Sequence, residues 1–386
     1  MRYGLDLPRD PATVAPPVDP PLRALSLAVA QKCNLGCTYC YAQGGAFGGP
    51  ARDMPLEVAR QAIDQLLDGT PRGGRVNLAF LGGEPMINRE VLHAATEHAS
   101  ERAAALGISL GLSLTTNGTL LSPADARFFE RHGFAVSISL DGLGATHDRQ
   151  RPYKSGRGSF ARIRRNFEPF LGLRGRMQVS ARVTVTPANL DLPRTLDGLL
   201  GMGFWSVGFS PMLSSPGRRG EMAPVDFDVM LEQMIACGRE YERRTIAGER
   251  YAFANLATAL QEIHKGSARA YPCGAGGTYL GVSAEGGLFA CHRFVDEPAA
   301  RLGDLSAGID PPRRQAWLTE RHLAAQAPCR DCWARQLCGG GCHHEVIHRG
   351  RPACDYIRGW LHYCLGAYVR LGAARPDLFP RLAGSG

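Results

Sequence analysis

The stretch ALSLAVAQKCNLGCTYC, residues 24–40, joins a short apolar run to a compact group of cysteines. The run at 24–30 has the length and composition of a buried β-strand. Cys33, Cys37 and Cys40 follow it in the spacing C-x3-C-x2-C. A loop this tight brings three thiolates to one small object, and thiolates favour iron–sulfur clusters or zinc. Because a structural zinc site usually has four protein ligands and this loop offers three, we favour an iron–sulfur cluster with one open iron.

Strands and helices alternate downstream of this loop. Five further apolar runs are predicted strands, at 76–81, 109–115, 135–140, 177–186 and 205–210. Helical patterns lie between them at 55–67, 88–105, 122–131, 158–170 and 192–200. This alternation predicts an α/β fold with a parallel sheet covered by helices. Six such units are too few for an eight-fold barrel, so we expect a partial (β/α)6 TIM-like barrel with ligands at the C-terminal ends of its strands.

Composition narrows the class of protein. The 386 residues are 44% hydrophobic and 21% charged, which is ordinary for a globular protein. The net charge is +8, but no basic run is interleaved with aromatic residues, so we expect no nucleic-acid partner. No apolar run reaches the length of a membrane span, and 1–22 has no apolar signal core, so we expect a cytoplasmic protein with no membrane partner. Twelve cysteines in such a compartment indicate metal rather than disulfides.

A second group of cysteines occupies the C-terminal third. Its members are Cys273, Cys291, Cys329, Cys332, Cys338, Cys342 and Cys354. Predicted strands at 278–282 and 287–290 form a hairpin that would bring the first two together. A four-thiolate zinc site of Cys329, Cys332, Cys338 and Cys342 is the alternative. We expect Cys237 to be a buried core thiol, and His292, His343 and His344 to be hydrogen-bond partners of sulfur or surface residues.

The first cysteine loop, with Tyr39 before its last cysteine, resembles the radical S-adenosylmethionine (SAM) superfamily over about 24–211. The resemblance extends to GGEP at 82–85, TTNG at 115–118, SISLDG at 137–142 and HDRQR at 147–151. It implies a [4Fe–4S] cluster on Cys33, Cys37 and Cys40. It also implies that Glu84 contacts the SAM amino group, Arg151 the SAM carboxylate and Tyr39 the adenine. The SAM-binding residues it implies are Tyr39, Gly82, Gly83, Glu84, Pro85, Thr115, Asn117, Ser139 and Arg151.

The second cysteine group resembles the SPASM domain, an extension that carries auxiliary iron–sulfur clusters, over about 273–354. The resemblance implies two auxiliary [4Fe–4S] clusters. The first would be held by Cys273, Cys291 and Cys342, and the second by Cys329, Cys332, Cys338 and Cys354. The first cluster then has either an open iron or a fourth ligand in Cys364. We expect a flexible segment at 1–22, a radical SAM barrel at 23–213, a linker with bridging helices at 214–269 and a SPASM domain at 270–386.

The resemblance also implies a reaction, in which SAM is reductively cleaved to a 5′-deoxyadenosyl radical. FLGGEPMIN at 80–88, CGAG at 273–276 and CHRFV at 291–295 resemble thioether-forming peptide maturases, which include the maturase group of quinohemoprotein amine dehydrogenase. We therefore expect sulfur-to-carbon crosslinking of a ribosomally made peptide.

Other readings stay open. A carbon–carbon cyclophane-forming or anaerobic sulfatase-type maturase is the alternative among enzymes. A non-catalytic iron–sulfur electron-transfer or scaffold protein is the alternative of another class, and a zinc-binding nucleic-acid protein is the third. The expected partners are a peptide or protein substrate and a low-potential electron donor of flavodoxin or ferredoxin type. Because 32 residues precede Cys33, we also expect leader recognition to need a separate protein or none.

Overall fold

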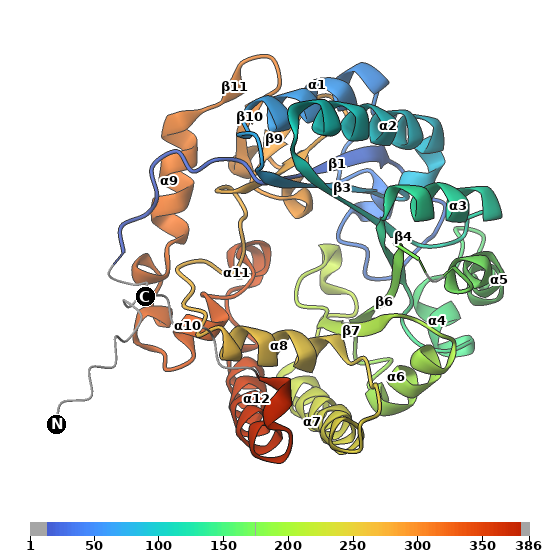
Figure 1. Ribbon diagram of the computed structural model, residues 1–386, viewed down its shortest axis with the longest axis vertical. Coiled ribbons are helices and arrows are strands. Elements are labelled where there is room, and N and C mark those ends of the chain that lie inside the picture. Colours follow the sequence, from blue (N-terminus) through green and yellow to red (C-terminus); the bar gives the residue numbers. More distant parts are fainter. Residues whose placement is uncertain (1–13, 174, 380–386) are drawn as a thin grey trace.

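A computed structural model describes residues 14–173 and 175–379, and it contains an open ring of parallel strands (Figure 1). The parallel strands are β1 (Ala24–Gln31), β3 (Arg75–Gly82), β4 (Ser109–Thr116), β5 (Ala135–Ser139), β6 (Gln178–Val185) and β7 (Ser206–Pro211). They lie side by side in that order, and each is parallel to its neighbour. The six predicted strands are therefore confirmed, together with the predicted α/β partial barrel.

Helices cover the outer face of this sheet, as Figure 1 shows. They are α1 (Leu56–Asp68), α2 (Arg89–Leu106), α3 (Pro123–His132), α4 (Ala145–Gln150), α5 (Phe160–Leu171) and α6 (Leu192–Gly201). Seven of the eight residues of β1 are buried, which agrees with a strand packed on both faces. Ser122 starts α3 through a capping box with Asp125, and Pro123 occupies the first turn.

The sheet continues beyond β1 into the C-terminal third. Strand β8 (Tyr279–Val282) pairs in parallel with β1, and β9 (Gly287–Phe289) returns beside it as the predicted hairpin. Strands β10 (Arg301–Asp304) and β11 (Gly308–Ile309) extend this edge and were not predicted. The short β2 (Arg52–Asp53) pairs with the end of β1.

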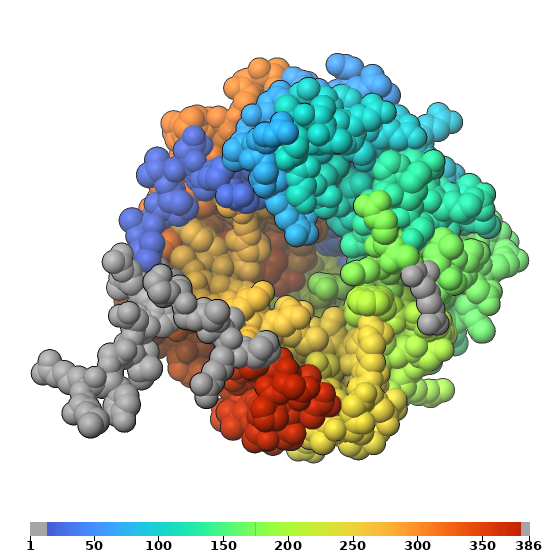
Figure 2. All heavy atoms as spheres, in the orientation of Figure 1, coloured from blue at the N-terminus to red at the C-terminus, as the bar shows by residue number. Residues whose placement is uncertain are grey.

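The remaining helices close the other side of the ring (Figure 1). They are α7 (Pro224–Ile246), α8 (Ala254–His264), α9 (Pro311–Arg321), α10 (Arg335–Cys338), α11 (His343–Arg349) and α12 (Cys354–Ala374). Helix α12 packs against α7 and α8. One apolar core runs from Leu25 in β1 to Leu371 in α12, so the C-terminal elements share the core of the barrel. Figure 2 shows that this face of the molecule is hollowed at its centre.

Part of the segment predicted to be flexible, 1–22, is anchored. Residues 1–13 lie outside the described residues. The buried Arg314 side chain donates to Asp19 Oδ1 at 2.6 Å and to the Pro20 carbonyl. These contacts hold the chain just before β1. No helix in the described part of the chain has both the length and the apolarity needed to span a bilayer.

Candidate cofactor site

The loop that follows β1 carries the first three cysteines and is fixed by the segment after α4. The Gly36 amide donates to the Pro152 carbonyl at 2.8 Å, and the Thr38 amide donates to the Gln150 carbonyl at 3.1 Å. Because these are backbone hydrogen bonds, they set the path of the loop independently of side chains. The loop therefore lies at the C-terminal edge of the strands, where parallel sheets bind ligands.

The three thiols of this loop lie close enough to influence one another. Cys33 and Cys40 each raise the pKa of Cys37, while the Arg151 guanidinium lowers it. Burial is the largest effect and raises the pKa of Cys37 to about 12. Burial likewise raises the pKa of the Cys33 thiol, and Cys40 raises it further. The structure thus brings together the three residues that the spacing predicts as one ligand set.

The GGEP turn after β3 presses against the end of β1. Gly82 has φ 149°, and a Cβ there would lie 2.2 Å from the Ala30 carbonyl oxygen. A Cβ on Gly83 would lie 2.3 Å from the Lys32 carbonyl oxygen. Either contact is far too short, so only glycine fits at both positions. This close packing places Pro85 and its neighbours beside the cysteine loop.

Glu84 is a fully buried carboxylate at the centre of this edge. It accepts hydrogen bonds from Thr116 Oγ1 at 2.7 Å, the Asn117 amide at 2.7 Å and the Met86 amide at 3.0 Å. Burial raises the pKa of Glu84, although these three donors lower it. Thr116 was not among the predicted binding residues, and Thr115 beside it is exposed. Successive residues of a strand face opposite ways, so only one of these two threonines can reach Glu84.

Asn117 connects the loop after β4 to the cysteine loop. Its Nδ2 lies 2.9 Å from Asn34 Oδ1 and 3.7 Å from Cys33 Sγ. Asn34 Nδ2 in turn donates to Thr119 Oγ1 at 2.8 Å. These contacts place a predicted SAM-binding residue beside a predicted cluster ligand.

Arg151 faces the same edge from the end of α4. Its Nη1 donates to the Tyr39 hydroxyl at 2.7 Å and lies 3.5 Å from Asp141 Oδ2. The Tyr39 hydroxyl also donates to Asp141. Burial raises the pKa of Asp141, although Arg151 lowers it. Arg151 Nε is buried and has no hydrogen-bond partner among the described residues, so the guanidinium retains a donor for an anionic ligand.

The other polar residues of the HDRQR segment have structural contacts. His147 Nδ1 accepts from the Asp141 amide at 3.2 Å, and its Nε2 lies 3.0 Å from Ser159 Oγ. Asp148 Oδ1 accepts from the amides of Ser159 at 2.7 Å and Phe160 at 2.8 Å, at the start of α5. Ser139, another predicted contact, ends β5 opposite Arg182 of β6. His147 and Asp148 therefore position the segment from which Arg151 extends.

Three C-terminal cysteines meet near the β8–β9 hairpin. The pKa of the buried Cys291 thiol is raised to about 12, chiefly by burial and further by Cys342 and Cys273. Burial also raises the pKa of Cys273, and Cys342 raises it further. Arg293 Nη1 lies 3.9 Å from Cys342 Sγ and supplies a nearby cation. These are the three residues that the sequence analysis grouped as the first auxiliary ligand set.

The other four C-terminal cysteines line a separate pocket. Burial raises the pKa of Cys329, while the cation of Arg351 lowers it. The pKa is raised further by the neighbouring thiols of Cys338, Cys354 and Cys332. The pocket is lined by Cys329, Cys332, Cys338 and Cys354, and Cys342 lines it as well. Between Cys338 and Cys342 the three glycines 339–341 all have positive φ, from 71° to 98°. This left-handed turn separates the last two cysteines of the run and lets them serve different groups.

The donor sets fit iron–sulfur clusters better than zinc. Tetrahedral zinc with Zn–S bonds of about 2.3 Å holds its sulfurs about 3.8 Å apart. No three cysteine sulfurs in residues 14–173 and 175–379 lie within 4.8 Å of one another. The wider spacing leaves room for irons and sulfides between the ligands. Because the buried thiols hold their protons, a metal must displace those protons to be ligated.

The remaining cysteines and the three histidines do not belong to these ligand sets. Cys237 and Cys364 are fully buried in α7 and α12. Burial raises the pKa of Cys364, and the charged group that raises it further is Glu242 rather than a cysteine. Ten residues of helix separate Cys364 from Cys354, a rise of about 15 Å. His292 Nδ1 lies 2.7 Å from the Tyr279 hydroxyl. His343 and His344 are buried, so they are not surface residues.

Sequence comparison agrees with the order of these motifs. Residues 27–201 match the profile of the Radical SAM superfamily. The serine-type anaerobic sulfatase-maturating enzyme of Klebsiella aerogenes is 26% identical over 358 residues, which cover 90% of this chain and 86% of that protein. The cysteine-type anaerobic sulfatase-maturating enzyme of Clostridium perfringens is 23% identical over 341 residues, which cover 84% and 89% respectively.

Solved structures share the fold. The enzyme anSMEcpe with bound AdoMet has a TM-score of 0.75 and 20% identity, covering 92% of this chain and 100% of that one. SuiB of Streptococcus suis bound to S-adenosylmethionine has a TM-score of 0.61 and 16% identity, covering 86% and 76%. Residues 27–201 are therefore similar to a radical SAM domain, and the chain is an enzyme. The similarity implies one [4Fe–4S] cluster and SAM.

Proposed function

We propose that this enzyme is a maturase that removes a hydrogen atom from a side chain of a peptide or protein substrate. SAM bound at a [4Fe–4S] cluster would supply the 5′-deoxyadenosyl radical for that step. The observation that carries the proposal is the convergence of Glu84, Asn117 and Arg151 on the cysteine loop. A buried anion and a buried cation beside one cluster site suit a ligand with one ammonium and one carboxylate.

Each residue then has a defined role. Cys33, Cys37 and Cys40 hold the cluster. Glu84 receives the ammonium of SAM, and Thr116 and Asn117 hold Glu84 in place. The free Nε of Arg151 receives the SAM carboxylate, because it is a buried donor with no partner among the described residues.

The proposed substrate site is a cavity beside the cysteine loop. The cavity has a volume of about 820 Å³ and is lined by Tyr41, Arg293 and Glu297, among others. Burial raises the pKa of the Tyr41 hydroxyl, and both Cys40 of the first loop and Cys291 of the C-terminal group raise it further. A side chain bound there would lie between the two proposed cluster sites. Related folds support a peptide substrate, since anSMEcpe was solved with a Cp18Cys peptide and SuiB with the precursor peptide SuiA.

For the C-terminal cysteines we propose two auxiliary clusters. Cys273, Cys291 and Cys342 would hold the first, and Cys329, Cys332, Cys338 and Cys354 the second. The burial of Cys364 in α12 supports a first cluster without a fourth protein ligand, in which one iron would be open to a substrate thiolate. This open position favours sulfur-to-carbon thioether formation. A low-potential donor of flavodoxin or ferredoxin type and a separate leader-binding protein are the proposed partners.

The names of the related enzymes favour a second chemistry. Sulfatase-maturating enzymes match this chain over most of their length. In a reaction of that type the chain would oxidise the Cβ of a serine or cysteine. The two chemistries leave different products, because a thioether consumes a thiol without forming a carbonyl. Loss of two hydrogens from the Cβ and hydroxyl of serine gives a carbonyl, and the same loss from cysteine gives a thiocarbonyl that water converts to a carbonyl with release of sulfide.

One experiment tests the shared proposal. The enzyme is reconstituted anaerobically with iron and sulfide and is then mixed with SAM and dithionite. We expect 5′-deoxyadenosine, and we expect the C33A/C37A/C40A variant to form none. The C237A variant is the matched control, because it removes a buried thiol that lies in α7. Product from the triple variant would contradict the assignment.

A second experiment separates the two chemistries. Peptides that carry cysteine or serine are incubated with enzyme, SAM and reductant. Loss of two hydrogens together with loss of thiol alkylation supports thioether formation. A product that reacts with a hydrazide supports oxidation of the sulfatase type. The same peptides are also prepared with deuterium on the side chain. If neither labelled peptide transfers deuterium to 5′-deoxyadenosine, the substrate is of another class.

A further inference from the structure

Helix α11 carries a metal-binding pattern that the cluster assignments do not use. Residues 344–348 read His-Glu-Val-Ile-His, which is the H-E-x-x-H spacing. On a helix, histidines four residues apart project from one face and can hold the same metal ion. Both histidines lie on α11, and both line the substrate cavity described above.

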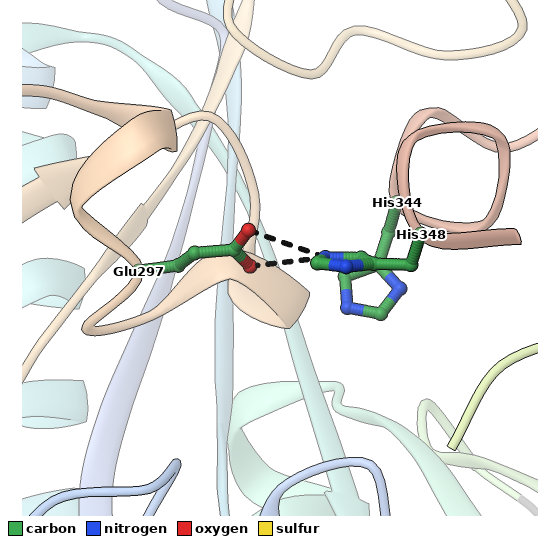
Figure 3. A group of neighbouring side chains, drawn as sticks. All are labelled: Glu297, His344 and His348. Carbon is green, nitrogen blue, oxygen red and sulfur yellow. Dashed lines mark hydrogen bonds and ion pairs between the residues drawn. The ribbon is translucent and has the colours of Figure 1, made fainter. Parts of the chain in front are cut away.

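A third donor comes from a distant part of the chain. Glu297, in the loop before β10, lies opposite the two histidines (Figure 3). One ligand atom from each of Glu297, His344 and His348 lies within 4.8 Å of the others. His348 Nε2 lies 3.2 Å from both carboxylate oxygens of Glu297, and the two imidazole centroids are 4.4 Å apart. Among the described residues no other set of three such donors is this compact.

An ordinary ion pair does not account for His344. Its side chain is 8% exposed, and its Nδ1 is buried with no hydrogen-bond partner among the described residues. A buried imidazole nitrogen without a partner is costly, because its lone pair or proton has lost water and gained nothing. A metal ion beside Glu297 and His348 would satisfy this nitrogen.

We propose that Glu297, His344 and His348 bind one divalent zinc ion at the wall of the substrate cavity. Two imidazoles and one carboxylate are a set that zinc uses in open sites, where a fourth position is left to water or to substrate. Donors in such a site lie about 3.4 Å apart, so the three donors, which now lie within 4.8 Å of one another, draw closer when the ion binds, and the exposed His348 side chain has room to move. A substrate carbonyl or thiolate in the cavity would take the fourth position.

The surrounding charges permit a cation there. Arg293 lines the same cavity, and it donates to Glu345 at 2.7 Å. Arg349 is paired with Glu221 at 3.1 Å. Because Glu345 is held by Arg293, it is not free to act as a base toward a metal-bound water, so the site binds and orients a ligand rather than hydrolysing a peptide bond.

The proposed zinc donors are distinct from the proposed cluster ligands. All three use nitrogen or oxygen, which suit zinc, whereas the seven C-terminal cysteines offer sulfur. The inference therefore does not depend on the proposed maturase reaction. Its test reads metal content and position, and SAM cleavage does not enter it.

The test uses the full chain with its clusters reconstituted. Zinc is added, excess is removed against a weak chelator, and zinc, iron and sulfide are measured by mass spectrometry and colorimetry. We expect the wild type to retain one zinc per chain that H348A and E297Q lose, with iron and sulfide unchanged. H98A is the matched control, because it removes a histidine paired with Asp64 at 2.9 Å on another face.

Crystals of the wild type provide an independent reading. Anomalous scattering at the zinc and iron edges separates zinc from the clusters. A zinc peak between Glu297, His344 and His348 is the expected result. A zinc peak only at cysteines, no zinc peak, or equal zinc retention by H348A, E297Q and the wild type would overturn the proposal.

Discussion

The Arg151 guanidinium donates a hydrogen bond to the Tyr39 hydroxyl at 2.7 Å, across 112 residues of sequence. Tyr39 lies in the cysteine loop between Cys37 and Cys40, so this bond fixes a buried cation beside the proposed cluster site. Arg151 in turn lowers the pKa of Cys37, against the larger effect of burial. The loop and the arginine therefore behave as one unit.

This relationship predicts a loss of SAM affinity in R151Q. The substitution removes a charged donor that we propose for the SAM carboxylate, and hydrogen bonds to charged groups contribute about 1.5–3 kcal/mol. We expect SAM binding to weaken by about 10- to 100-fold, while the cluster is still assembled. Equilibrium binding of SAM under anaerobic conditions measures this change. R149Q is the control, because Arg149 is exposed on the same helix; equal weakening in both variants would contradict the role of Arg151.

Glu84 gives a second prediction. In E84Q the carboxylate is replaced by an amide, whose NH2 group cannot accept from both Thr116 and the Asn117 amide as the carboxylate does. We expect KM for SAM to rise at least about 10-fold, because the anion that receives the ammonium is lost. Steady-state formation of 5′-deoxyadenosine measures KM and kcat separately. E90Q, an exposed change on α2, should match the wild type; an unchanged KM in E84Q would count against the proposed contact.

The first strand of the barrel was predictable from sequence because it is buried on both faces. The run at 24–30 is continuous and apolar for that reason, and β1 forms where it was expected. Helix α12 was missed because nothing at its start signals a helix. Ala353 precedes it without a side-chain cap, and its first residue, Cys354, was interpreted as a ligand. Strands β10 and β11 are short edge strands that depend on β9 for pairing, so their own sequence carries little signal.

The candidate site was predictable only as a set of loops. The motifs identified which loops meet at the strand ends, but not which side chain of each loop faces inward. Thr116 rather than Thr115 reaches Glu84, because strand alternation selects one neighbour and the motif names both. The backbone bonds from Gly36 to Pro152 and from Thr38 to Gln150 join segments more than 100 residues apart, and no local pattern encodes them.

A third prediction concerns stability and pH at the start of α3. The buried Asp125 side chain accepts from Arg89 Nε at 2.9 Å and Nη2 at 3.1 Å. Burial alone would raise its pKa, but contacts with His93, Arg89 and Ser122 outweigh that effect and lower the pKa to about 2. Since the folded pKa is below the ordinary value near 3.9, the stabilisation is complete above about pH 4 and is lost as the pH falls toward 2.

D125N should therefore destabilise the protein by about 2 kcal/mol at neutral pH. Thermal melting of D125N and the wild type measures the difference, which should stay constant from pH 7 to about pH 5 and narrow below pH 4. Taking the difference at each pH removes acid effects that both proteins share. D68N is the control, because Asp68 is exposed and its pair with Arg102 contributes at most about 1 kcal/mol. A difference independent of pH would exclude Asp125 as the titrating group.

The last prediction separates the two groups of C-terminal cysteines through the turn that divides them. Cys338 and Cys342 flank three glycines with positive φ, and each thiol interacts with a different set of cysteines. C342A should therefore lose the iron of the first auxiliary site and keep the second, whereas C338A should do the reverse. A [4Fe–4S] cluster contains four irons, so each variant should fall by about four irons per chain. C364A should keep the iron content of the wild type, because its thiol is buried against α7. Mössbauer and electron paramagnetic resonance spectra identify which signal disappears, and loss of the same signal from C338A and C342A would show that the turn does not divide the ligands.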